Sequence, residues 1–405
     1  MNVVSGSPVA LFGVVALLVA CGTANDSTPT AADAGPDAAR EPELGLNDVS
    51  VLAPLPPSQD AEGWLSATSA GAMGELLPRA VFDAIPTFPV NTANALNYAF
   101  MRVLGIRFDG CHKATSDDSC HAQVRMVMQP VNFDGEARDS ALHLFYSLSD
   151  TQFAGAVTRL RAMRALAPEQ TVDAALSVSP ALAAQGMGGR YAQALHSLVL
   201  ELCGEQNLTR MTFFLRAPPN QETWFFGGFE RKDSALETMN IRGVGAGNQR
   251  VIRVDDNGAE TGYSYDISPS PIVPEDGRAL LSTKAAAAAN TELRATTFAS
   301  YLRLENPRLY TPDEAACAGC HISAYIVGES QRVFGLSPSG FPDAQFASKH
   351  LIGPKADRQT ESGAQRSSLR AFGYFESTAM VAPRTVNETA AVLEDIEARY
   401  AAKSL

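Results

Sequence analysis

The sequence predicts an α+β domain over residues 62–284, followed by a small all-α domain over residues 285–405. Strand-like alternation of apolar and polar residues gathers in the first region, above all between about residues 209 and 268, behind segments with helical periodicity. From residue 285 onward the alternation gives way to helical periodicity. Strands and helices grouped in this way favour an α+β fold over strict βαβ alternation.

The composition is that of a globular protein with an acidic balance. The chain has 405 residues, of which 45% are hydrophobic, so it can bury a sizeable core. Lys and Arg number 32 and Asp and Glu number 44, which gives a net charge of −12. An acidic chain repels phosphate backbones, and no local basic stripe offsets that repulsion. We therefore expect no nucleic-acid partner.

Residues 1–21 have the pattern of an export signal. The apolar run of residues 9–20 is too short to span a bilayer and is typical of a signal-peptide core. Residues 22–61 are rich in Ala, Thr, Asp and Pro, a composition that buries too little apolar surface to offset chain entropy. We predict a flexible stalk over residues 22–61.

The segment Leu18-Val19-Ala20-Cys21 resembles the lipobox of bacterial lipoproteins. The resemblance implies cleavage before Cys21, a diacylglycerol on its thiol, and attachment to a membrane of the cell envelope. Gly22 stands where some lipoproteins carry an inner-membrane retention aspartate, so the outer membrane is favoured. The segment before the apolar run departs from the pattern because it contains no Lys or Arg. The alternatives are an ordinary signal peptide cut elsewhere and a misplaced start codon.

The α+β region contains the elements but no recognisable catalytic motif. Helical periodicity predicts helices over 92–104, from Asp150 to Met163, and over 191–202. Period-two alternation predicts strands over 124–128, 142–146, 211–215, 224–226 and 252–254. No phosphate loop, nucleophile elbow or paired acid motif is present, so this region does not reveal its role.

The cysteines and histidines of this region stand apart from one another. Cys111 and Cys120 flank a polar loop, and an exported chain favours a disulfide between them; a metal site, a second haem or free thiols are the alternatives. Cys203 follows an apolar helical face, which indicates a buried, inert thiol. His143 and His196 are solitary, in a predicted strand and helix, and receive no functional role.

The C-terminal region predicts three helices and a looped middle. The first covers residues 285–304, and it ends before Pro307 because a residue that precedes proline is pushed out of the helical region. Capping boxes at Thr311 and at Thr385 predict the starts of the other two. Residues 335–367 read as loops.

The second of these helices carries the one motif with chemistry in it, the CxxCH sequence at residues 317–321. CxxCH is the attachment sequence of c-type haem. Positions i and i+3 share a helical face, so the thiols of Cys317 and Cys320 can reach one edge of a porphyrin. His321 follows directly and offers a neutral imidazole to the iron.

Residues 305–405 resemble the mono-haem c-type cytochromes, through a helix that bears CxxCH, a later methionine and a terminal helix. The resemblance implies one covalent haem c, with Cys317 and Cys320 as thioether anchors and His321 as the proximal ligand. It implies Met380, the only methionine after the motif, as the distal ligand. His350 is the rival, and an open sixth position is a further alternative.

The expected function is single-electron transfer in the cell envelope to a redox partner that the sequence does not identify. A second hypothesis is an envelope lipoprotein whose α+β domain binds a ligand or partner, with Cys317 and Cys320 in a structural disulfide. A zinc site with His321 and His350, and a redox dithiol, are alternatives for the same cysteines. A third hypothesis is an enzyme in which an open-coordinate haem reacts with peroxide or a small gas, so the sequence leaves enzymatic activity undecided.

Overall fold

The structure is a computed structural model. It describes residues 42–86, 96–110, 121–216, 223–233, 235–241, 247–255, 261–265, 290–312, 314–353, 364–365 and 368–400. All of them belong to one compact unit, Glu41–Ser404. The signal peptide with Cys21, the pair Cys111 and Cys120, and the predicted boundary near residue 284 lie outside the described residues.

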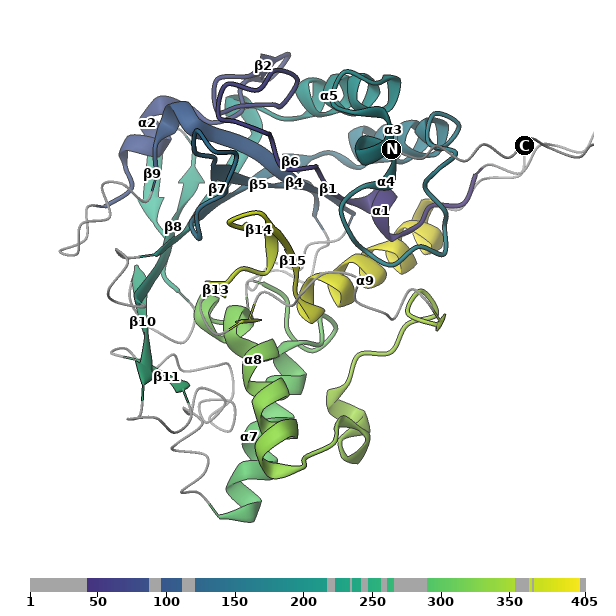
Figure 1. The fold of residues 1–405 in the computed structure, drawn as a ribbon. Helices are drawn as coiled ribbons and strands as arrows, with labels where there is room; N and C mark the ends of the chain where they lie inside the picture. Colours follow the sequence, from purple (N-terminus) through teal and green to yellow (C-terminus); the bar gives the residue numbers. More distant parts are fainter. Residues whose placement is uncertain are drawn as a thin grey trace, which may run out of the picture. The chain divides into compact units, whose positions relative to one another are not determined.

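The largest element is an antiparallel sheet, which in the described residues has nine strands in the order β1-β4-β5-β6-β7-β8-β10-β11, with β9 paired to β8 (Figure 1). The strands are β1 (Ser50–Leu52), β4 (Met101–Asp109), β5 (Ala122–Pro130), β6 (Ala141–Leu148), β7 (Leu208–Arg216), β8 (Thr223–Lys232), β9 (Ala235–Thr238), β10 (Asn248–Asp255) and β11 (Thr261–Tyr265). The predicted strands fall within β5, β6, β7, β8 and β10. The α+β class is therefore confirmed.

One predicted helix is wrong. The segment expected to be helical over 92–104 enters β4, and a 3-10 turn at Tyr98–Phe100 precedes it. Nearly every residue of β4 is buried, which means that the strand packs on both faces. A strand buried on both sides reads as a continuous apolar run, and periodicity alone cannot separate such a run from a helix.

The end of the predicted stalk is also part of the folded body. Residues Leu46–Val49 form the short helix α1, which leads directly into β1, and Leu46 and Leu52 are at most 1% exposed. β1 adds to the edge of the sheet beside β4. This pairing supplies hydrogen-bond partners for the backbone N–H and C=O groups of a segment that its composition alone predicted to be disordered.

Two helices cover one side of the sheet. α3 (Asp150–Arg164) begins with a capping box formed by Ser149 and Gln152, and it contacts β5 and β6. α5 (Arg190–Leu202) packs against α3 and α4 (Pro180–Gln185). Both α3 and α5 lie above the sheet in Figure 1. Two further short strands, β2 (Ala70–Gly71) and β3 (Gly74–Glu75), and a short helix α2 (Arg79–Asp83) complete this part of the chain.

The C-terminal region holds helices but is not all-helical. α7 (Thr291–Leu304) is capped by the Asn290 side chain, α8 spans Cys317–Phe334 and α9 spans Pro383–Tyr400. Between α8 and α9 lie short antiparallel pairs, β12 (Ala364–Gln365) with β13 (Ser368–Leu369) and β14 (Phe372–Phe375) with β15 (Thr378–Val381). The expected all-α description is corrected by these pairs, which are too short to register as alternation in the sequence.

The predicted start of the second C-terminal helix is shifted as well. Glu314 accepts a hydrogen bond from the Thr311 backbone N–H, which is one half of a capping box, but the Thr311 hydroxyl also donates to Glu314 instead of accepting from its N–H. These bonds close a turn, and the helix begins only at Cys317. The cap of α8 comes from the sheet instead. The Ala318 N–H donates to Gln249 Oε1 of β10 at 3.1 Å, which satisfies one of the N–H groups that a helix start leaves open.

The C-terminal elements share hydrophobic clusters with the sheet. β14 contacts β4 and β5, and Phe372, Tyr374 and Leu393 belong to the same buried cluster as the strands. A second cluster joins the sheet to α7 and α8 and contains Phe214, Trp224, Phe226, Phe298, Tyr301, Ile322 and Ile326. Within the described ranges, none of the helices combines the length and the hydropathy needed to cross a membrane.

Candidate functional site

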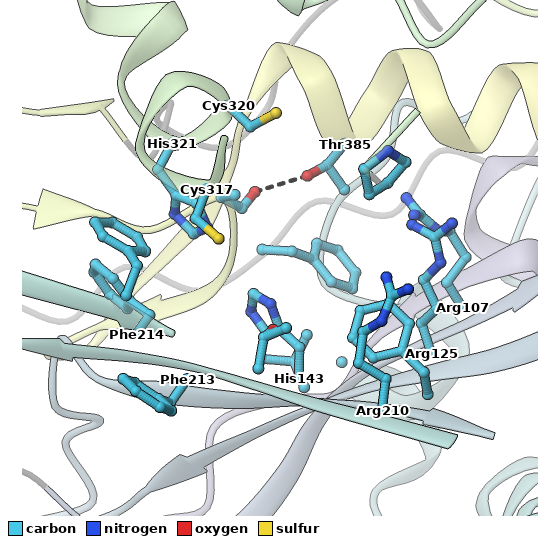
Figure 2. A pocket seen from close by; sticks show the side chains of 18 of the residues that line it. Arg107, Arg125, His143, Arg210, Phe213, Phe214, Cys317, Cys320, His321 and Thr385 are labelled. Carbon is cyan, nitrogen blue, oxygen red and sulfur yellow. Dashed lines mark hydrogen bonds between the residues drawn. The ribbon is translucent and has the colours of Figure 1, made fainter. Parts of the chain in front are cut away.

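A cavity of about 790 Å³ lies between the sheet and the start of α8. Its lining comes mainly from β4 to β8, from the first turn of α8, from Ala371 and Phe372 at the start of β14, and from the first turns of α9 (Figure 2). Pockets that bind small molecules and cofactors commonly have volumes of roughly 300–1,000 Å³. The cavity is large enough for a cofactor.

All three residues of the motif border this cavity. Cys317, Cys320 and His321 occupy the first turn of α8 and line the cavity together. Ala318, which lies between the two cysteines, is fully buried and lets the helix approach the sheet closely. The structure therefore brings together the three residues that the sequence predicts to act together.

His321 is held in one orientation. Its Nδ1 lies 2.7 Å from the carbonyl oxygen of Leu369, and a carbonyl can only accept, so Nδ1 carries the proton and donates. The lone pair is then on Nε2. The ring also lies against Phe214 and Phe226, with centroid distances of 5.2 and 5.0 Å. A carbonyl on one ring nitrogen is the usual way in which proteins fix a metal-binding histidine.

His321 is also neutral. Burial lowers the pKa of His321 to about 4, against the opposing effect of its hydrogen bond to Leu369. At neutral pH the imidazole keeps the lone pair that a metal requires.

The two cysteines are free thiols in this structure. Burial raises the pKa of Cys317 to about 12 and raises the pKa of Cys320 as well, so both are protonated at neutral pH. Figure 2 shows the sulfur of Cys317 directed toward the sheet and that of Cys320 on another side of the helical turn. The alternative in which they form a structural disulfide is therefore not the arrangement seen here.

A second histidine, His143 of β6, borders the same cavity. Its ring and that of His321 are parallel within 9°, and their centroids are 6.1 Å apart. Burial is the largest cause that lowers the pKa of His143 to about 3, and the His321 and Arg370 charges act in the same direction. Sequence reasoning assigned His143 no role. Period-two alternation could have indicated its position, because it places His143 on the face of the strand opposite to the core residues Leu142 and Leu144.

Arginines form another part of the wall. Arg107, Arg125, Arg210 and Arg384 line the cavity, with Glu230 and Glu388 as the carboxylates among its described lining residues. Glu388 forms ion pairs with Arg107 and, at 2.7 Å, with Arg384. Although burial alone would raise it, the charges of these arginines hold the pKa of Glu388 well below its usual range. Positive charge exceeds negative charge in this wall.

The two candidates for a distal ligand lie elsewhere. Met380 is fully buried in β15, where it pairs with Gly373, and it is not a lining residue of the cavity. His350 is 4% exposed, and its Nε2 lies 3.2 Å from Glu397 of α9. Across the described part of the chain, no three His, Cys, Asp or Glu side chains are grouped to hold a metal ion. The zinc site with His321 and His350 is thus not assembled, and Cys203 is a buried free thiol as expected.

Comparison of the chain with models of protein families, with curated proteins and with solved structures finds no match.

Proposed function

We propose that the chain is an exported, lipid-anchored, c-type cytochrome-like protein that binds one haem covalently and passes single electrons in the cell envelope. The observation that carries the proposal is the first turn of α8, where Cys317, Cys320 and an oriented, neutral His321 border one cofactor-sized cavity. Cys317 and Cys320 would hold the haem through thioethers, and His321 Nε2 would bind the iron. Bound haem supplies a one-electron couple whose potential depends on the axial ligands and the dielectric around it.

The cavity wall fits a porphyrin in chemistry as well as in size. Phe213, Phe214 and Phe226 give it an aromatic side that excludes water. A haem also carries two carboxylates, and the arginines on the other side of the cavity are suitable partners for them. In this view the sheet supplies one wall of the haem site, and α8, α9 and the start of β14 supply much of the rest.

Export and membrane attachment through Cys21 are part of the same proposal. Cleavage before Cys21 and its lipidation would tether the folded body to a membrane of the cell envelope, with the outer membrane favoured by Gly22. The redox partner is a protein, and the acidic net charge of −12 suits a partner with a basic docking surface.

The test is covalent retention of haem. The chain is exported in a host with haem-maturation machinery and then denatured, and visible absorption and mass are measured on the polypeptide. We expect the colour to stay with the chain and its mass to increase by one haem. The double variant Cys317→Ala/Cys320→Ala should lose both, while Cys203→Ala, which removes a buried thiol away from the cavity, should keep both. A mature chain without added tetrapyrrole would contradict the proposal.

The cavity also supports a second candidate, an envelope lipoprotein that binds an anionic small molecule. Its support is the excess of arginines over carboxylates in the lining. The same export experiment separates the two candidates, because a colourless wild-type chain would leave only the binding protein.

A further inference from the structure

His143 projects into the cavity from the middle of the sheet. In β6 it is paired on one side with Val127 of β5 and on the other with Thr212 of β7. A backbone that is paired on both sides has little freedom to shift, so the sheet fixes the point from which this imidazole extends. The pairing of β6 with both neighbouring strands therefore places His143 at the wall of the cavity.

The accessible surface of His143 indicates where its ring is open. The residue is half-buried, although its neighbours Leu142 and Leu144 are fully buried. Because His143 is a lining residue of the cavity, its remaining exposure is toward the cavity. In the described portion of the chain, neither ring nitrogen has a hydrogen-bond partner, and the ring contacts that of His321.

The separation of the two rings matches a shared metal. With each metal–nitrogen bond about 2 Å long, two imidazoles on opposite sides of one metal ion have ring centres roughly 6 Å apart. The centroids of His143 and His321 are 6.1 Å apart, with planes 9° from parallel in a stacked arrangement, so it is the separation of the rings, and not the direction of their nitrogens, that matches a shared metal. Neither Met380 nor His350 lines the cavity that His321 enters.

We infer that His143 is the second axial ligand of the haem iron that His321 binds, an inference that rests on the proposed function. The ligand pair would come from two distant parts of the chain, the central sheet and the CxxCH helix. Two imidazole ligands leave no open coordination position, which suits electron transfer and disfavours reaction with peroxide or a gas. They also give a lower potential than a histidine–methionine pair.

The test compares exported haem-loaded variants at the three candidate positions: His143→Leu, His143→Met, Met380→Leu and His350→Gln. For wild type we expect a low-spin spectrum without a methionine–iron charge-transfer band. His143→Leu should become high-spin in the ferric state. Its affinity for carbon monoxide should rise about tenfold or more, because the sixth position is then free in every molecule rather than in a minor fraction.

The variant His143→Met is the control for a general loss of structure. Methionine can bind iron, so this variant should return to a low-spin spectrum and acquire the charge-transfer band, with a potential above that of wild type. Met380→Leu and His350→Gln should keep the wild-type spectrum and carbon monoxide affinity.

The possible failures are distinguishable. A His143→Leu protein that retains covalent haem and the wild-type spectrum overturns the inference and leaves the proposed function intact. A Met380→Leu protein that becomes high-spin also overturns it. A wild-type chain that carries no covalent haem removes both the inference and the proposed function.

Discussion

Gln129 of β5 holds both backbone polar groups of Tyr374 in β14. The Tyr374 N–H donates to Gln129 Oε1 at 2.7 Å, and Gln129 Nε2 donates to the Tyr374 carbonyl at 2.8 Å. Gly373 makes this approach possible, because it has φ +135° and a Cβ at that position would collide with the Gln129 side chain. One buried side chain thus fastens the C-terminal hairpin to the sheet.

Replacement of Gln129 by Leu should therefore weaken the fold. It leaves the buried N–H and carbonyl of Tyr374 without partners, and we expect the free energy of unfolding to fall by about 3 kcal/mol. Urea unfolding measures the change. Gln193→Leu is the matched control, since the exposed Gln193 makes one bond to the Gly188 carbonyl, and its effect should stay within about 0.5 kcal/mol. Equal effects of the two variants would show that the Gln129 bonds do not stabilise the fold.

Replacement by alanine at two glycine positions should change the stability of the fold in opposite directions. A Cβ at Gly105 of β4 would lie 2.8 Å from the Phe372 ring, so Gly105→Ala should destabilise by about 1–3 kcal/mol through overpacking beside the cavity. Gly328 is exposed in α8 with nothing within 4 Å of its Cβ position, so Gly328→Ala should stabilise by about 0.5–1 kcal/mol. Thermal unfolding of both variants checks the signs. A stabilised Gly105→Ala protein would mean that Phe372 moves aside without cost.

Removal of the negative charge from the buried ion pair of Arg370 and Asp139 should destabilise the fold. Arg370 is fully buried; burial lowers its pKa to about 10, against the opposing charge of Asp139 at 3.7 Å. Asp139→Asn keeps an acceptor for the Trp224 indole N–H, which donates to Asp139 at 2.9 Å, but removes the charge. We expect a loss of about 3–5 kcal/mol in urea unfolding.

The control for that variant is Asp83→Asn. Asp83 pairs with Arg79 on an exposed helical turn, where the side chains are 53% and 64% accessible. Exposed pairs contribute about 0–1 kcal/mol, so this variant should change stability little. If Asp139→Asn matched it, Arg370 would not need a buried counter-charge.

Glu388 should make the stability depend on pH. The charges of Arg107, Arg384 and Arg125 hold its pKa in the folded state below the ordinary value of 4.5, so the unfolded chain binds more protons at acidic pH. The stabilisation is complete above the unfolded pKa and decreases as the pH falls below it. Glu388→Gln should cost about 3 kcal/mol at pH 7.

The pH series distinguishes this effect from those of other carboxylates. Below about pH 4.5 the difference between wild type and Glu388→Gln should shrink by up to about 1.4 kcal/mol per pH unit. Urea unfolding from pH 7 to pH 3 measures it. A difference that stays constant over this range would show that Glu388 is not the titrating group.

The sequence predicts local features of this chain better than those that depend on tertiary contacts. The CxxCH helix and the alternating strands β5 to β8 carry their own periodicity, so they were predictable. β4 was not, because burial on both faces erases alternation. The role that we infer for His143 depends on which helix lies opposite β6, and neighbouring residues do not contain that information. The order of residues along the chain favours Met380, whereas in the structure Met380 belongs to a hairpin and does not line the cavity.

The hydrophobic cluster that joins β4 and β5 to β14 and α9 limits how the chain can be divided. A fragment that stops at residue 284 would lack Phe372, Tyr374 and Leu393, and the apolar underside of its strands would face water. Such a fragment should aggregate when it is expressed alone. Co-expression with residues 285–405 should rescue its solubility, so the two halves would behave as a split protein.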